Sequence, residues 1–168
     1  MQSKLLVASA IAATALLAAG CGSTNQSTAT GSPSPSPAAA SPSPSPAAAQ
    51  ATIAVATNAK LGQILVDGKG MTVYLWVADT ATTSTCYTSC ATFWPPVLTT
   101  GAPQAGAGAQ ASLLGTTTRT DGMVQVTYAG HPLYYFQKDK QAGDATGQGS
   151  NGFGALWWVL SPSGKAMH

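Results

Sequence analysis

The sequence predicts an all-β domain made of two repeats, in an antiparallel sandwich-like or barrel-like arrangement with one short helical turn. Residues 70–79 return sixty positions later as residues 130–139, with matching residue types at several positions. From Thr52 onward, apolar and polar residues alternate with a period of two, which is typical of β-strands. No stretch of the domain carries a long apolar stripe at the helical period.

The repeat is defined by a tyrosine, a second aromatic residue and an aspartate. These are Tyr74, Trp76 and Asp79 in the first copy and Tyr134, Phe136 and Asp139 in the second. A single repeat unit rarely buries its own apolar face, so the two copies are expected to cover each other. We place repeat 1 at about residues 61–98 and repeat 2 at about residues 113–164.

Alternating apolar residues and turn signals predict the individual strands. We expect strands at residues 53–55, 64–66, 71–77, 113–119, 123–128, 133–137 and 156–160. Asp121-Gly122 predicts a hairpin turn, because such turns need positive φ. Both faces of the 71–77 strand are apolar, which favours a sheet covered on both sides. One or two helical turns are expected at residues 89–94, ended by Pro95.

The N-terminal residues 1–20 have the features of a lipoprotein signal peptide. Lys4 precedes an apolar run at residues 5–17, and small residues lead to Cys21. A run of this length is too short for a bilayer core, which takes about 20 residues. The Cys after Ala-Ala-Gly resembles the bacterial lipobox, in which the cysteine becomes the lipidated first residue of the mature protein. We therefore expect palmitate-type acyl chains on Cys21 and a location on the extracytoplasmic side of the bacterial cell membrane.

Residues 21–51 read as the lipidated cysteine followed by a disordered linker. The segment is rich in Ser, Thr, Pro and Ala, and Ser-Pro-Ser-Pro-Ser-Pro occurs at residues 32–37 and again at 41–46. Alternating proline forbids a helix and leaves no apolar face to bury. Such a segment extends by about 3.1 Å per residue. It would hold the domain at residues 52–168 away from the membrane.

Charged residues make up 7% of the chain, whose formal net charge is +2, and the acidic residues are five Asp with no Glu. Neither sign forms a run. This excludes the basic footprint of a nucleic-acid-binding protein. The expected partners are the membrane, through the lipid anchor, and a component of the cell envelope or cell wall.

Cys86 and Cys90 are the two cysteines left for the domain once Cys21 is lipidated. An exported chain meets an oxidising environment, so a disulfide is the expected state. Four extended residues would separate the two Cα atoms by about 13 Å, which is beyond disulfide reach. The segment must therefore curl into a turn, next to the helix expected before Pro95.

Copper or redox chemistry is the alternative function. Two thiolates four residues apart with a distant imidazole, that of His131, suit copper. Cys86, Cys90 and His131 together resemble the ligand set of copper-delivery proteins of the Sco type. Those proteins have a thioredoxin-like α/β fold, and the helices of that fold are missing here. We therefore expect no cofactor or metal in the main interpretation.

The remaining polar residues form no catalytic arrangement in the sequence. Asp79 and Asp139 close the two motifs, and a carboxylate at a strand end usually accepts hydrogen bonds from turn amides. Residues 139–144 are an alternative calcium loop, without the alternating acids of an EF-hand. Motifs of serine hydrolases, phosphate loops, zinc sites and dinucleotide sites are absent. The sequence therefore predicts no catalytic residues.

Several motifs in order together resemble a known family. They are Tyr-x-aromatic-x-x-Asp at 74–79 and 134–139, Cys-x-x-x-Cys-Ala-x-x-Trp-Pro-Pro at 86–96, Arg-x-Asp-Gly at 119–122 and Gly-Asp-x-x-Gly-Gln-Gly at 143–149. They resemble predicted bacterial lipoproteins with this motif, described as secreted repeats of unknown function. The resemblance covers about residues 61–164. It implies an exported lipoprotein of repeats and brings no activity. Ala129 stands where the family commonly has Asn before Gly, and Ala tolerates positive φ poorly.

We therefore expect a membrane-anchored, extracytoplasmic lipoprotein that presents a disulfide-braced β-repeat domain. Its expected role is that of a binding or structural module of the cell envelope.

Overall fold

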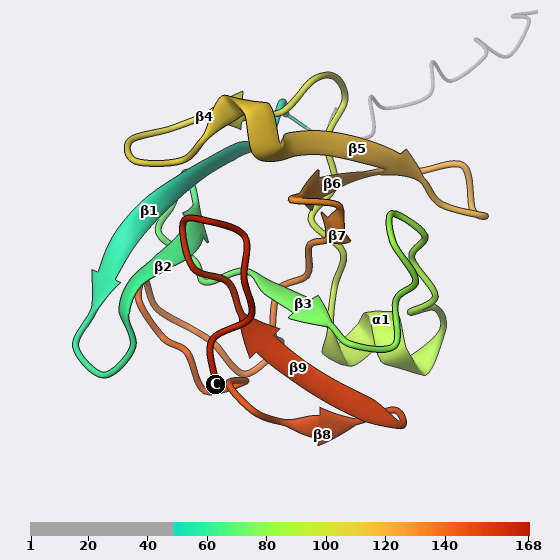
Figure 1. Cartoon of the computed structure of the whole chain (residues 1–168). Coiled ribbons are helices and arrows are strands. Elements are labelled where there is room, and N and C mark those ends of the chain that lie inside the picture. Colours follow the sequence, from blue (N-terminus) through green and yellow to red (C-terminus); the bar gives the residue numbers. More distant parts are fainter. Residues whose placement is uncertain (1–48) are drawn as a thin grey trace, which may run out of the picture. The chain divides into compact units, whose positions relative to one another are not determined.

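The computed structural model describes residues 49–168, and the predicted signal peptide, Cys21 and most of the linker lie outside them. Within these residues the chain is all-β, as predicted. Nine strands form three three-stranded sheets, and the helical segments are α1 (Ser89–Phe93) and the 3₁₀ turn η1 (Ala111–Leu113) (Figure 1). The helix lies where the sequence predicted it, directly before Pro95.

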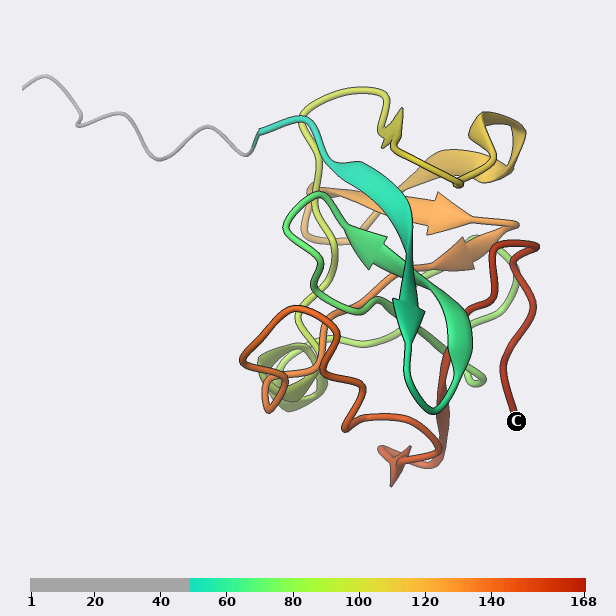
Figure 2. The ribbon, with the colours of Figure 1, turned by 90° about the vertical axis from the view of Figure 1, so that its left-hand side faces the viewer.

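The sheets have the strand orders β2-β1-β4, β3-β9-β8 and β5-β6-β7. Their strands are β1 (Thr52–Asn58), β2 (Gly62–Asp67), β3 (Tyr74–Trp76), β4 (Gln104–Ala105), β5 (Leu114–Thr118), β6 (Val124–Tyr128), β7 (His131–Pro132), β8 (Asn151–Gly152) and β9 (Ala155–Val159). Described pairs are antiparallel except β1–β4, which is parallel. Figure 2 shows the β1–β2 hairpin crossing one face, with α1 and β8 at the end away from β4 and β5.

Each half of the domain begins with a hairpin, β1–β2 in the first and β5–β6 in the second, so the first half starts before residue 61, where the sequence predicted the start of repeat 1. Gly122 has φ of 80° in the predicted turn, and Gly62 has φ of 76° at the corresponding position of the first hairpin. Ala129 also adopts positive φ, 50°, next to Gly130. The turn therefore keeps the left-handed backbone despite the Cβ of alanine.

The two repeats exchange their strands. β3 of repeat 1 pairs with β9 of repeat 2, in the register Tyr74↔Val159. In the matching place of the other half, Tyr134 of repeat 2 forms a bridge with Pro96 of repeat 1. Where the motifs cross, the Tyr74 amide donates to the Tyr134 carbonyl at 2.8 Å, and the Tyr134 amide donates to the Tyr74 carbonyl at 3.0 Å. The β3-β9-β8 sheet is therefore built from both repeats.

The second motif does not form the regular strand predicted at residues 133–137. Its partner segment contains Pro95 and Pro96, which have no N–H to donate to a ladder. The bonds that remain are from the Tyr135 amide to the Pro95 carbonyl at 2.8 Å, from the Gln137 amide to the Phe93 carbonyl at 2.9 Å and, in the other direction, from the Val97 amide to the Leu133 carbonyl at 2.9 Å. Pro95 cannot return a bond to Tyr135, and this gap interrupts the ladder.

The β3 strand is buried on both faces, as predicted. Tyr74 and Trp76 lie in one hydrophobic cluster and Leu75 lies in a second one. Val77, which the pattern placed on a buried face, is 56% exposed, because β3 ends at Trp76. The first cluster also contains Cys86 and Cys90, so the predicted disulfide segment lies against the core.

Candidate functional site

The tyrosine of each motif binds the aspartate of the other motif. Tyr74 Oη donates to Asp139 Oδ2 at 2.5 Å, and Tyr134 Oη donates to Asp79 Oδ2 at 2.6 Å. Both tyrosines are fully buried, and Asp139 is 6% exposed. A hydrogen bond from a phenol to a carboxylate is among the stronger ones in proteins, about 1.5–3 kcal/mol. The motif residues therefore lock the two repeats together.

The second oxygen of each carboxylate is held by a threonine in the following loop. Asp79 Oδ1 accepts from the amide and hydroxyl of Thr85, at 2.8 and 2.9 Å. Asp139 Oδ1 accepts from the amide and hydroxyl of Thr146, at 3.0 and 2.5 Å. The two halves thus use the same construction, and each aspartate fixes the start of its loop.

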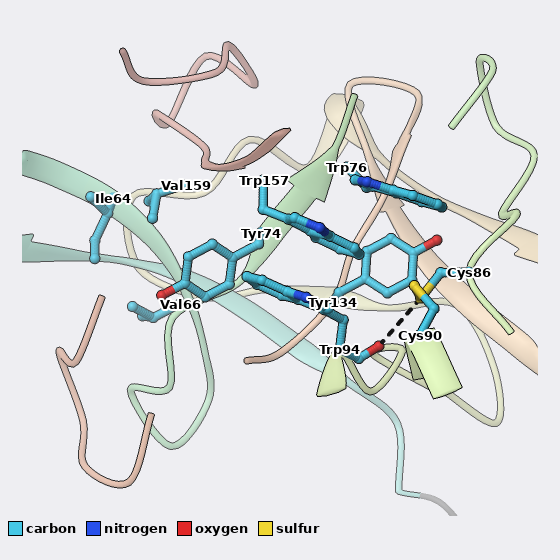
Figure 3. Packing of buried hydrophobic residues seen from close by; sticks show 10 residues of the cluster. All are labelled: Ile64, Val66, Tyr74, Trp76, Cys86, Cys90, Trp94, Tyr134, Trp157 and Val159. Carbon is cyan, nitrogen blue, oxygen red and sulfur yellow. Dashed lines mark hydrogen bonds between the residues drawn. A yellow bond between two sulfur atoms is a disulfide. The ribbon is translucent and has the colours of Figure 1, made fainter. Parts of the chain in front are cut away.

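Between the tyrosines, four aromatic rings form a column. Its order is Trp76, Trp157, Trp94 and Phe136, with centroid separations of 5.1, 4.0 and 4.2 Å. The planes of Trp94 and Trp157 differ by 1°, and Figure 3 shows the two indoles lying one over the other. Tyr74 meets Trp94 edge-on at 5.3 Å, and Tyr134 meets Trp157 edge-on at 5.2 Å. Rings from the two repeats alternate in this column.

Cys86 and Cys90 form the predicted disulfide, with an S–S distance of 2.01 Å and Cα atoms 5.3 Å apart. Both cysteines are buried beside Trp94 and Tyr134 (Figure 3). The bond closes the segment that leads into α1. It braces the loop after Asp79, and the corresponding loop after Asp139 has no cysteine.

The family assignment follows from residues 55–98 and 115–161, each of which matches one copy of a repeat described as a secreted repeat of unknown function. The chain belongs to this family of secreted repeats. The matched ranges coincide with the two halves that cross at Tyr74 and Tyr134. No curated protein and no solved structure matches the chain. In residues 49–168, no helix is long and apolar enough to cross a membrane.

In this protein of two secreted repeats, His131 does not lie beside Cys86 and Cys90. It lines a cavity of about 290 Å³ together with Leu75, Trp76, Val77, Asp79, Trp158, Ala166 and His168. Cys86 and Cys90 are bonded to each other elsewhere, and their sulfurs are not free to bind a metal. Within residues 49–168, no three His, Cys, Asp or Glu side chains converge as metal ligands. The alternative copper set is therefore not assembled here.

The proposed calcium loop is likewise used for internal bonds. The Asp139 carboxylate is occupied by Tyr74 and Thr146. Asp144 Oδ2 accepts from the amides of Lys140 and Gln141 at 2.8 and 2.9 Å. The carboxylates of Asp139 and Asp144 therefore accept hydrogen bonds from different groups of the protein.

Burial changes the acidity of the motif residues. Burial raises the pKa of Tyr74 far above its usual value, and the hydrogen bond to Asp139 and its charge add to the effect. The pKa of Tyr134 is raised in the same way, by burial and then by Asp79. Burial also raises the pKa of Asp79, against the opposing effect of the bonds from Tyr134 and Thr85. Both phenols therefore stay protonated and act as donors.

Sequence reasoning missed the role of Arg119. This residue is 4% exposed and its guanidinium donates to Ser84 Oγ at 2.6 Å, Gln125 Oε1 at 2.8 Å and the Cys86 carbonyl at 2.8 Å. It also lies 4.3 Å from the ring centroid of Tyr87. The Arg-x-Asp-Gly motif at 119–122 contained Arg119 but gave it no role, because Ser84 and Cys86 come from a distant segment. One feature of the sequence did indicate that the two loops are built alike. A threonine follows each motif aspartate after six or seven residues.

Proposed function

We propose that this protein is a lipid-anchored lipoprotein on the extracytoplasmic side of the bacterial cell membrane, where its β domain serves as a binding module of the envelope. Cys21 after Ala-Ala-Gly supports the anchor, and the family description supports export. The Ser/Pro-rich linker would carry the domain away from the bilayer.

The internal use of the motif groups is the observation that favours binding over catalysis. The phenols of Tyr74 and Tyr134 and the carboxylates of Asp79 and Asp139 bond to one another across the repeats. A nucleophile or a general base needs a free reactive atom within reach of a substrate. These groups instead build the centre of the fold.

The same construction suits a binding module because it is rigid. A four-ring column, two phenol–carboxylate bonds and a disulfide hold the loops that follow Asp79 and Asp139. A surface that is ordered before binding loses little conformational entropy when a ligand arrives. The loops are therefore the expected binding elements.

An exposed aromatic pair marks the end of the domain away from residue 49. Phe93 at the end of α1 and Phe153 in the β8–β9 turn are each 44% exposed, with ring centroids 5.9 Å apart. Phe153 has φ of 60°, which a phenylalanine rarely adopts. Figures 1 and 2 place both elements at the end opposite β4 and β5. This end is available to an envelope component.

The anchor and the binding role are tested separately. Labelling with a palmitate analogue followed by membrane fractionation should show label on the full chain and none on Cys21→Ser, which should leave the membrane.

For the binding role, purified full-length protein should sediment with isolated cell-wall material in a saturable way. Label that persists on Cys21→Ser would overturn the anchor, and unsaturable or absent sedimentation would overturn the binding role.

A further inference from the structure

The exchanged strands bring a hairpin turn of one repeat against the loop after the aspartate of the other, and this happens twice. In one place the turn after β5 meets the loop containing Ser84 and Tyr87. In the other, the turn between β1 and β2 meets the loop at residues 142–148 (Figures 1 and 2). The fold therefore offers two related niches whose contents can be compared.

The first niche is filled by the protein itself. Arg119 enters it with an almost fully buried side chain, donates to Ser84, Cys86 and Gln125, and covers the ring of Tyr87. The hydroxyl of Tyr87 in turn accepts from the Thr120 amide at 3.0 Å. The Arg119 side chain and its partners therefore occupy this niche.

The second niche lacks the residues that close the first. Sixty positions before Arg119 the chain has Ala59. With Thr85 matched to Thr146, the neighbours Ser84 and Tyr87 correspond to Ala145 and Gln148. A cavity of about 510 Å³ remains. It is lined by Thr57, Asn58, Ala59, Lys60, Leu61, Ala142, Gly143, Asp144, Ala145, Thr146 and Gln148. Its volume is within the range of ligand sites, about 300–1,000 Å³.

Two opposite charges line this cavity without joining each other. The Lys60 ammonium has no carboxylate within ion-pair distance among residues 49–168, where the one ion pair is Arg119–Asp121. Asp144 uses Oδ2 for the amides of Lys140 and Gln141, which lower its pKa and leave Oδ1 for another donor. Leu61, Ala142 and Ala145 add apolar side chains to the same lining.

We propose that the cavity between the β1–β2 turn and the 142–148 loop binds a short peptide with free ends and small aliphatic side chains. The carboxylate end would face Lys60, the ammonium end Asp144, and the side chains would contact the apolar residues of the lining. The proposal rests on the role as a binding module and names its ligand class. Because both charges are exposed to solvent, the affinity should fall as salt rises.

The first experiment is calorimetric titration of the purified full-length protein with L-alanyl-L-alanine. N-acetyl-L-alanyl-L-alanine amide, which has the same side chains and no charges, is the matched probe. We expect the free dipeptide to bind at least fivefold more tightly than the capped one. Equal affinities, or no binding of the free dipeptide, would overturn the proposal.

Variants then locate the site. Lys60→Gln and Asp144→Asn should each weaken dipeptide binding at least fivefold, whereas Lys69→Gln, outside the cavity, should not change it. Asparagine keeps an oxygen for the amides of Lys140 and Gln141. Ala59→Arg should fill the cavity as Arg119 fills the other niche and abolish binding. Undiminished binding in the Lys60 and Asp144 variants would overturn the assignment, even if Ala59→Arg fails to fold.

The dipeptide experiment and the cell-wall sedimentation experiment can fail independently of each other. Cell-wall sedimentation that persists without dipeptide binding would reject this cavity and retain the binding role at another surface. Dipeptide binding without cell-wall sedimentation would retain the cavity and reject the role in cell-wall binding.

Discussion

Trp94 and Trp157 stack with ring centroids 4.0 Å apart and 1° between their planes. Trp94 comes from repeat 1 and Trp157 from repeat 2, and each lies two residues before the residue that pairs with the motif tyrosine of the other repeat, Pro96 with Tyr134 and Val159 with Tyr74. The centre of the core is thus shared equally by the two copies. This shared core explains why the motif residues matter for stability.

Replacing a motif carboxylate should destabilise the domain. Asp139→Asn removes the charge that accepts from Tyr74 and Thr146, and we expect a loss of about 2 kcal/mol in the free energy of unfolding. Urea unfolding followed by tryptophan fluorescence measures this loss. Lys69→Gln, an exposed charge change, is the control and should cost less than about 0.5 kcal/mol. Equal stability of the two variants would show that the phenol–carboxylate bond contributes nothing.

The domain should lose stability in alkaline solution. The pKa of Tyr74 and that of Tyr134 are raised above the ordinary value of 10.0, so above that pH the unfolded chain loses protons that the folded chain keeps. The contribution of these two tyrosines to stability is therefore constant below about pH 10 and falls above it, by about 1.4 kcal/mol per pH unit for each. Urea midpoints from pH 7 to 11 measure the slope. Tyr74→Phe should start lower and show a shallower decline, and an unchanged slope would contradict the assignment.

The approach of Gly147 to the aromatic column should make it intolerant of a side chain. A Cβ there would lie 2.7 Å from Trp94 Cη2 and 3.0 Å from Phe136 Cγ. We expect Gly147→Ala to cost about 1–3 kcal/mol through overpacking. Gly101→Ala is the matched control, because its Cβ would meet nothing within 4 Å. Thermal unfolding of both variants should separate them clearly, and a Gly147→Ala protein as stable as the control would refute the packing argument.

The disulfide should be present in the exported protein and should stabilise it. Intact mass before and after alkylation should show Cys86 and Cys90 blocked, and metal analysis of the same sample should show no stoichiometric copper. Replacing both cysteines by serine should cost about 2 kcal/mol, as expected for a short closed loop. Alkylatable thiols with bound copper would support the alternative metal-handling function. His131→Ala should leave the disulfide intact.

The repeats should be unable to fold separately. A protease site inserted after Gly101, in the exposed connection between them, would cut the full chain into two halves that no disulfide joins. We expect the cut halves to elute together in gel filtration and to separate only in denaturant. The reason is that β3 needs β9 of the other half. A half that keeps a folded circular dichroism spectrum on its own would contradict the strand exchange.

The sequence by itself was sufficient for the elements whose signals are local. The period of two predicted strands, Asp121-Gly122 predicted the second hairpin turn, and Pro95 predicted the end of α1. The spacing of Cys86 and Cys90 predicted their disulfide, because an oxidised pair four residues apart must close a turn. These inferences held because each depends on residues within a few positions of one another.

Only the tertiary structure decided that the motif of each repeat pairs with a segment of the other repeat. An internal repeat indicates that two copies cover each other, but it does not say that Tyr74 bonds to Asp139 rather than to Asp79 of its own copy. That choice is made by contacts some sixty residues apart, for which a single sequence carries no signal. For the same reason, the niche that Arg119 closes and the niche that Ala59 leaves open became visible only when four distant segments were brought together.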